Sequence, residues 1–162
     1  MTATPTTLAP LVLVIDDEPD LRTLYELTLL REGYRVETAA TVAEARILLD
    51  RNPFAAVITD MRLPDGTGLD LLKEIQAQRR PERCMVITAY GSAENAVEAL
   101  KNGAFDYLTK PVDLKQFRTV VASAIRDRTS DRVAATRADM VAPRAGPWGP
   151  GETGSQGPSG TA

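Results

Sequence analysis

The stretch LVLVIDDE at residues 11–18 decides the fold class. Five consecutive apolar residues followed at once by acidic residues are typical of a buried parallel strand that carries carboxylates at its carboxyl end. A second apolar run, FAAVI at residues 54–58, is followed by Thr59 and then by Asp60. In open parallel sheets, ligands bind at the edge formed by the carboxyl ends of the strands. We therefore expect Asp16, Asp17 and Asp60 to lie close together at that edge.

Strand-like and helix-like segments alternate five times along the chain. The expected strands cover residues 11–15, 34–38, 54–58, 84–88 and 105–108, and the expected helices begin near residues 18, 41, 68, 92 and 113. This alternation predicts an α/β three-layer sandwich, doubly wound around a five-stranded parallel sheet. Two strand orders are usual for such sheets, the Rossmann type and the flavodoxin-like order 2-1-3-4-5. We favour the second, because it makes the first and third strands neighbours and gathers the three acids in one crevice.

Local signals mark the ends of these elements. Pro19 suits the first turn of a helix, and Gly33 suits the position after its last turn. The segment TVAE at residues 41–44 reads as a capping box, and Ser92 is expected to cap another helix. The sequence PDG at residues 64–66 predicts a turn.

Composition narrows the classes of protein that remain. The 162 residues are 43% apolar, enough for one domain with a core, and 22 acidic against 19 basic residues give no sign of direct nucleic-acid binding. The chain has no histidine, which excludes catalytic triads and histidine metal sites. Its single cysteine, Cys84, lies in an apolar run and suits a reducing compartment. We find neither a signal peptide nor a membrane-spanning stretch, so we expect a cytoplasmic protein without membrane contact.

The chain divides into three parts. Residues 1–9 are expected to be a flexible N-terminus and residues 10–128 to form the domain. Residues 129–162 are expected to be a disordered tail, because ten of the eighteen residues from 143 to 160 are glycine or proline. Such a composition cannot bury enough apolar surface to offset the entropy lost on ordering.

The predicted acidic cluster has a definite chemistry. Three neighbouring carboxylates repel one another and therefore favour a bound cation, and oxygen ligands with open positions suit Mg²⁺. With the negative charge screened, Asp60 could act as a nucleophile and carry a phosphoryl group as an acyl phosphate. Lys110 and the hydroxyl of Thr88 would bind the new phosphate oxygens. Each of these residues alone would more often be an ordinary cap, turn or strand-end residue, and it is their joint placement that carries the hypothesis.

Four segments together resemble the receiver domain of bacterial two-component response regulators. They are VIDDE (residues 14–18), TDMRLPDG (59–66), ITAYG (87–91) and GAFDYLTKP (103–111). The sequences of these segments also resemble the receivers of enhancer-binding transcription activators of the nitrogen-regulator and pilus-regulator type. Those activators continue into an ATPase module and a helix-turn-helix, whereas this chain has no phosphate-loop lysine and no apolar periodic segment after Arg128. ATP hydrolysis and DNA binding are therefore not carried over, and either a stand-alone receiver or a shortened regulator fits.

The resemblance implies a role for each matching residue. Asp16, Asp17, Asp60 and the backbone carbonyl of Arg62 would hold Mg²⁺, and Asp60 would accept the phosphoryl group from a sensor histidine kinase. Thr88 and Tyr107 would switch conformation together, and the Lys110–Pro111 peptide would be cis. Arg62 and Tyr90 would flank the path of the hydrolytic water and, being long, slow the loss of phosphate.

The resemblance also implies partners. Residues 92–102, 105–108 and 113–126 would form the output face, where two phosphorylated copies could pair. The first helix carries more apolar positions than one buried stripe needs, so we expect some of them to dock against the kinase.

Two other functions are alternatives to this reading. An aspartate-nucleophile phosphatase of the haloacid-dehalogenase type would need a second acid two residues after Asp60, where Arg62 stands. A receiver that serves only as a non-phosphorylated docking module would have lost a site residue, and none is missing. We thus predict a receiver with no enzymatic activity beyond its own phosphorylation and dephosphorylation.

Overall fold

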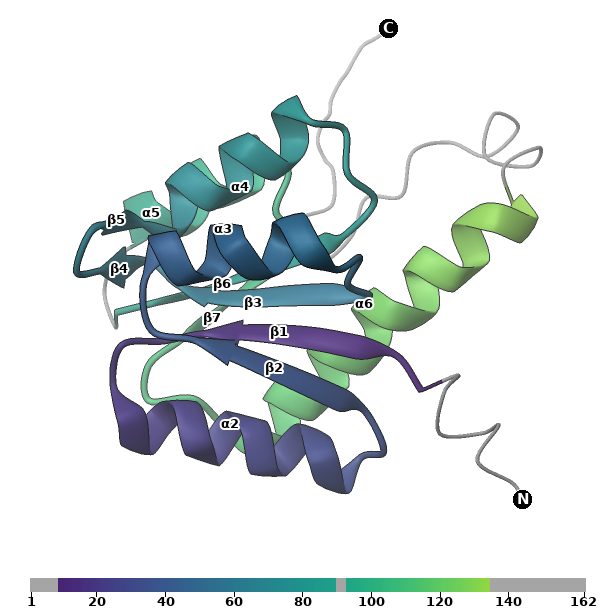
Figure 1. The fold of residues 1–162 in the computed structure, drawn as a ribbon, viewed down its shortest axis with the longest axis horizontal. Helices are drawn as coiled ribbons and strands as arrows, with labels where there is room; N and C mark the ends of the chain where they lie inside the picture. The colour runs from purple at the N-terminus through teal and green to yellow at the C-terminus, as the bar shows by residue number, and fades with distance from the viewer. Residues whose placement is uncertain (1–8, 90–92, 135–162) are drawn as a thin grey trace, which may run out of the picture. The chain divides into compact units, whose positions relative to one another are not determined.

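The protein, described by a computed structural model over residues 9–89 and 93–134, with side chains described through residue 126, contains one central parallel sheet (Figure 1). Its strands are β1 (Leu11–Ile15), β2 (Arg35–Ala39), β3 (Ala56–Asp60), β6 (Arg83–Thr88) and β7 (Asp106–Thr109). The helices are α2 (Pro19–Arg31), α3 (Val42–Arg51), α4 (Gly68–Ala77), α5 (Ala93–Lys101) and α6 (Leu114–Ala134). Two short strands, β4 (Arg62–Leu63) and β5 (Gly66–Thr67), pair as an antiparallel hairpin.

The strand order in the sheet is β2-β1-β3-β6-β7, with every neighbouring pair parallel. This confirms the predicted order 2-1-3-4-5. Because the register pairs Ile15 with Thr59, the residues that follow them, Asp16 and Asp60, become neighbours at the carboxyl edge of the sheet. The order of the strands therefore brings together acids that are 44 positions apart in the chain.

Two hydrophobic layers cover the sheet, as the sandwich requires. Helices α3, α4 and α5 lie over one face and α2 and α6 over the other (Figure 1). On the second face, the rings of Tyr25 in α2 and Phe117 in α6 stack with their centroids 5.0 Å apart, and both side chains are buried. Residues of β1 alternate between the layers: Val12 and Val14 pack on one side, Leu13 and Ile15 on the other. A strand buried on both faces explains the unbroken apolar run.

Several predicted end signals are confirmed. Pro19 occupies the first turn of α2, and Gly33 follows that helix with φ +93°, a backbone angle that favours glycine. Half of the predicted capping box at residues 41–44 is present: the hydroxyl of Thr41 accepts a hydrogen bond from the N–H of Glu44, whereas the carboxylate of Glu44 accepts the N–H of Ala40 and not that of Thr41. The PDG turn forms the tip of the β4–β5 hairpin. Ser92 lies outside the described residues.

β1 matches its predicted bounds, whereas the other four strands differ from their predicted bounds by one or two residues. β2 begins at Arg35 because the N–H of Tyr34 bonds instead to the carbonyl of Leu29 and closes the end of α2. β3 begins at Ala56, since the N–H of Phe54 is donated to the carboxylate of Glu82. It extends to Asp60, which pairs with Ile87 of β6. β7 is likewise shifted by one residue relative to the prediction.

The final helix is longer than predicted. α6 continues to Ala134 rather than ending near residue 126. Residues 127–134 contain neither glycine nor proline, and the next proline is Pro143, so no breaker ends the helix at the predicted position. Residues 1–8 and 135–162 lie outside the described part of the chain, and the three-part division stays a prediction. None of the described helices is both long and apolar enough to span a bilayer.

Candidate functional site

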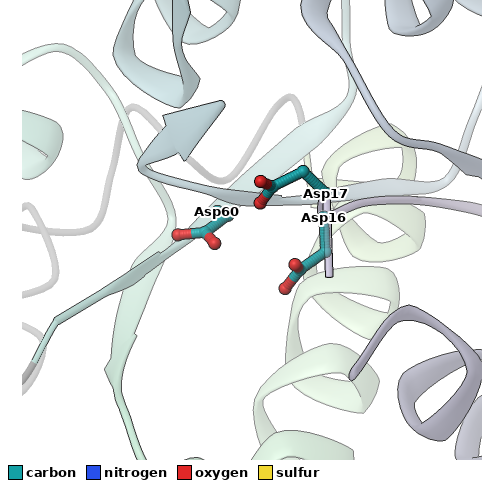
Figure 2. A group of neighbouring side chains, drawn as sticks. All are labelled: Asp16, Asp17 and Asp60. Atoms are coloured by element: carbon teal, nitrogen blue, oxygen red, sulfur yellow. The ribbon is translucent and has the colours of Figure 1, made fainter. Parts of the chain in front are cut away.

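The three predicted acids meet at the carboxyl edge of the sheet. Asp16 and Asp17 directly follow β1, and Asp60 is the last residue of β3. Figure 2 shows their side chains converging, and one carboxylate oxygen of each lies within 4.8 Å of the others. Asp16 and Asp60 are buried, whereas Asp17 is exposed. The cluster is therefore closed toward the sheet and open toward solvent.

Asp16 is fixed in place by its neighbours in the chain. Its Oδ1 accepts a hydrogen bond from the N–H of Glu18 at 2.8 Å, and its backbone carbonyl accepts one from the guanidinium of Arg22 at 2.8 Å. Its other carboxylate oxygen, Oδ2, is buried and has no hydrogen-bond partner among the described residues. Burial, and then the negative charge of Asp60, raise the pKa of Asp16.

Lys110 supplies the positive charge of the site. Its ammonium donates a hydrogen bond to Oδ2 of Asp60 at 2.8 Å, and its backbone N–H bonds to the carbonyl of Thr88 at 2.9 Å. Burial alone would lower the pKa of Lys110, but the hydrogen bond to Asp60 and the charges of the nearby carboxylates outweigh burial and raise it. The lysine therefore stays protonated while it faces the acids. The peptide bond that follows it, to Pro111, is cis as predicted.

The backbone around Asp60 is closely packed. The hydroxyl of Thr59 donates to the carbonyl of Asp60, and the N–H of Arg62 points at Asp60 Oδ1 from 3.4 Å. A Cβ atom at Gly68 would lie 2.5 Å from the carbonyl oxygen of Asp60. Glycine is thus required at this position, because any side chain would displace the backbone of Asp60.

Thr88 and Tyr107, predicted to switch together, lie on neighbouring strands β6 and β7. Thr88 is completely buried, and its hydroxyl has no hydrogen-bond partner among the described residues. Tyr107 is half-buried, and its position in the sheet pairs with Val86. The switch itself stays a prediction. Tyr90 lies outside the described residues.

A pocket of about 390 Å³ opens beside Asp60. Asp17, Arg62 and Lys110 line it together with residues that the sequence analysis did not select: Glu18, Met61, Leu63, Pro64, Ala89 and Asn95. Asn95 lies in the first turn of α5 and lines the pocket, and no motif in the sequence marks this residue. The pocket gives a phosphate-sized group a route to the carboxylate of Asp60.

The donor set fits a small divalent cation. The carboxylates supply oxygen atoms, the ligands that Mg²⁺ prefers, and the unpartnered Oδ2 of Asp16 is a buried acceptor that such a cation would satisfy. Asp17 lies on the solvent side, where water could reach such a cation. The proposed ligation by the carbonyl of Arg62 stays a prediction, although the main chain of Arg62 borders the cluster.

Two residues near the site were missed by the sequence analysis. Asp65, at the hairpin tip, accepts hydrogen bonds from the N–H groups of Val42 and Ala43 at 2.8 and 3.0 Å. Asp70 completes a capping box with Thr67 at the start of α4. The sequence TGLD at residues 67–70 contains that second signal, but nothing local reveals that Asp65 reaches a helix 22 positions earlier.

Comparison with known proteins gives a consistent result. The response regulator receiver domain family matches residues 12–122. The response regulator protein PilR of Pseudomonas aeruginosa is 55% identical over 120 residues, which are 74% of this chain and 27% of PilR. The photosynthetic apparatus regulatory protein RegA of Cereibacter sphaeroides is 44% identical over 107 residues, 65% of this chain and 57% of RegA. The chain thus spans about a quarter to three fifths of the length of these relatives.

Solved receiver structures agree. The beryllofluoride-activated NtrC4 receiver domain dimer is 32% identical with a TM-score of 0.69, covering 73% of this chain and 98% of that one. The signal receiver domain of a Luxo repressor protein from Vibrio parahaemolyticus is 30% identical with a TM-score of 0.74, covering 78% and 98%. The similarity to PilR and NtrC4 confirms the finer resemblance to pilus-regulator and nitrogen-regulator receivers.

Proposed function

The chain belongs to the response regulator receiver family, and on this premise we propose that Asp60 is its phosphoacceptor and that a sensor histidine kinase is the donor. The observation that carries the proposal is the contact of Lys110 with Asp60 inside the acidic cluster, 2.8 Å between Nζ and Oδ2. A nucleophilic carboxylate needs a positive neighbour and an open approach, and the pocket beside Asp60 provides the approach.

The transfer would proceed by displacement at phosphorus. A carboxylate oxygen of Asp60 attacks the phosphorus of a phosphohistidine, the new O–P bond forms as the N–P bond breaks, and the histidine nitrogen leaves and takes up a proton. Lys110 then holds a phosphoryl oxygen in place of the carboxylate that it now contacts. The buried hydroxyl of Thr88, without a partner in the described structure, would turn to another phosphoryl oxygen.

Asp16, Asp17 and Asp60 would hold Mg²⁺, with the carbonyl of Arg62 as a further ligand. When bound, the cation would screen the negative charges of the carboxylates and of the incoming phosphoryl group. The site does not support an aspartate-nucleophile phosphatase, because the position two residues beyond the nucleophile carries Arg62, whose side chain is exposed. We assign no reaction beyond phosphorylation of Asp60 and hydrolysis of its acyl phosphate. We propose that both occur in the cytoplasm, a reducing compartment that suits the free thiol of Cys84.

The kinase would dock on α2. Leu24, Leu27 and Leu30 are 41%, 50% and 46% exposed, as the excess of apolar positions in this helix predicted. Leu24 and Leu27 also line a pocket of about 160 Å³ between α2 and the start of α6. Because α2 begins two residues after Asp17, a helix that covers these leucines would stand beside the pocket of Asp60.

Pairing of two phosphorylated copies would use α5, β7 and α6. Val97 on α5 is 50% exposed and offers an apolar contact on that face. The proposal is limited to this chain: the reactions and partners of the longer relatives are not assigned to it.

The direct test is chemical labelling. The full chain is incubated with acetyl phosphate and Mg²⁺, and intact-mass spectrometry looks for one added phosphate that is stable in acid and lost in base. Asp60→Asn should abolish labelling while its circular dichroism spectrum stays that of the wild type. Asp113→Asn, which changes an exposed aspartate elsewhere, is the matched control. Full labelling of Asp60→Asn would reject the assignment.

A further inference from the structure

The segment that leaves the acceptor residue is a very short hairpin. Its strands, β4 and β5, pair only Arg62 with Thr67 and Leu63 with Gly66. The base of the hairpin lies on the site, since the N–H of Arg62 points at Asp60 Oδ1 and the N–H of Gly68 bonds to the carbonyl of Met61 at 2.8 Å. A two-stranded hairpin of this size is marginally stable by itself. Its position therefore depends on contacts with the rest of the protein, namely the packing of Leu63 against the core and the contacts of its tip.

Asp65 makes the contacts of the tip. Both oxygens of its carboxylate accept hydrogen bonds from the first two N–H groups of α3, those of Val42 and Ala43. Such N–H groups have no partner within a helix, and the helix dipole favours a negative charge there. Those two hydrogen bonds, the one from Val42 first, lower the pKa of Asp65. Gly66 lies against the same helix end, because a Cβ atom there would be 3.1 Å from Cγ2 of Val42.

Thr41 and Asp65 cap different N–H groups of α3, and they also differ in what they connect. The helix already has a local cap, since Thr41 accepts the N–H of Glu44, and Glu44 in turn accepts the N–H of Ala40. Asp65 adds something that Thr41 does not: it joins α3 to the segment that carries Arg62.

We propose that Asp65 is a positioning residue for phosphoryl transfer, which holds the tip of the β4–β5 hairpin on α3 and thereby keeps the main chain of Arg62 against the acidic cluster. The inference rests on the proposed function, because the main chain of Arg62 matters only if the cluster binds a cation. A hairpin free to pivot about its base would have to be ordered each time the cation binds. A hairpin fixed beforehand avoids that entropic cost.

The test compares Mg²⁺ binding by the full chain and three variants, Asp65→Ala, Asp65→Asn and Thr41→Ala, by isothermal titration calorimetry and by ¹H–¹⁵N NMR. Asp65→Ala should weaken Mg²⁺ binding about tenfold, the low end for groups that orient metal ligands. Amide hydrogen exchange in residues 62–67 should accelerate in the same variant. Thr41→Ala also removes a cap of α3, so it should lower the melting temperature yet leave the Mg²⁺ dissociation constant unchanged. Asp65→Asn keeps one acceptor oxygen and should fall between Asp65→Ala and the wild type.

The outcomes separate the two proposals. If the wild type does not bind Mg²⁺, the metal site of the proposed function fails. If the wild type binds and Asp65→Ala binds equally well, only the role of Asp65 is overturned. An equal loss of affinity in Thr41→Ala would also overturn it, because the effect would then come from α3 itself. If Asp65→Ala does not fold, Asp65→Asn decides, and wild-type affinity in that variant would reject the proposal.

Discussion

The ammonium of Lys110 donates a 2.8 Å hydrogen bond to the carboxylate of Asp60, a residue 50 positions earlier in the chain. Asp60 ends β3 and Lys110 directly follows β7, and these strands are not adjacent, because β6 lies between them. A hydrogen bond from the N–H of Lys110 to the carbonyl of Thr88 fixes Lys110 to the intervening strand β6. From there the lysine side chain reaches Asp60. Lys110 is thus held in contact with Asp60 by the sheet itself.

Replacing Lys110 with Ala should slow phosphorylation of Asp60 by acetyl phosphate by about 10²-fold, the usual loss when one preorganised donor to a developing charge is removed. Initial rates of labelling at saturating Mg²⁺ measure the effect, and Lys115→Ala, an exposed lysine of α6, serves as control. The pKa of Lys110 is raised above its ordinary value of 10.5. The stabilisation from the Lys110–Asp60 ion pair is therefore fully present just below pH 10.5 and is lost as the pH rises through the higher pKa of the folded state. Unchanged labelling would remove Lys110 from the mechanism.

Mg²⁺ should stabilise the unphosphorylated protein, because it relieves repulsion among three carboxylates and binds only the folded state. The gain in unfolding free energy is about 1.4 kcal/mol when free Mg²⁺ is about tenfold above its dissociation constant. Asp17→Ala should remove most of the rise in melting temperature, and because Asp17 is exposed the metal-free variant should fold normally. Glu37→Ala, another exposed acid, should behave as the wild type. A melting curve that Mg²⁺ leaves unmoved would argue against the site.

Much of this site could be predicted from the sequence, because the apolar runs that form the sheet also place the acids. The residues after β1 and at the end of β3 meet in any sheet in which those strands are neighbours. The sequence could not place contacts that depend on tertiary geometry. Asp65 reads as an ordinary turn residue until α3 is seen to begin beside it. The start of β3 was wrong for the same reason, since the bond from Phe54 to Glu82 joins residues 28 positions apart.

Glu82 should stabilise the opposite end of the sheet. Its carboxylate is buried and pairs with Arg80, which also donates to the carbonyls of Leu49 and Asn52. Glu82→Gln should lower the unfolding free energy by about 3 kcal/mol, as expected when one partner of a buried ion pair is removed. Glu74→Gln, which breaks an exposed pair with Arg46, should cost less than about 1 kcal/mol. Urea denaturation at neutral pH compares the two variants.

The pH dependence of this effect has a definite sign. Burial would raise the pKa of Glu82, but hydrogen bonds from Arg80 and Phe54 outweigh burial and hold it below the ordinary value of 4.5. The stabilisation is therefore present above pH 4.5 and lost as the pH falls through the lower folded value. The gap between wild type and Glu82→Gln should close over that range, and a gap that persisted would show that the effect is steric.

Charged residues in place of Leu24 and Leu27 should prevent the kinase from docking without affecting phosphorylation of Asp60 by acetyl phosphate. The double variant Leu24→Glu with Leu27→Glu should lose most phosphotransfer from a purified sensor kinase that labels the wild type. Labelling by acetyl phosphate should stay normal, because neither residue lines the pocket of Asp60. Ile47→Glu, at a residue of α3 that is 51% exposed, controls for an added surface charge. Normal transfer to the double variant would place the kinase on another face.

The phosphorylated state should be long-lived. Arg62 is one of the residues that line the pocket of Asp60, and Tyr90 stands two residues beyond Thr88 in the sequence. Long side chains at these two positions could cover the acyl phosphate and exclude water from the line of attack. Arg62→Asn combined with Tyr90→Ala should therefore speed the loss of phosphate several-fold, measured as decay of the added mass after acetyl phosphate is removed. Arg79→Asn, at an exposed arginine beyond the end of α4, is the control. A decay rate that stays the same or falls would show that Arg62 and Tyr90 do not guard the bond, as expected if both side chains extend into solvent.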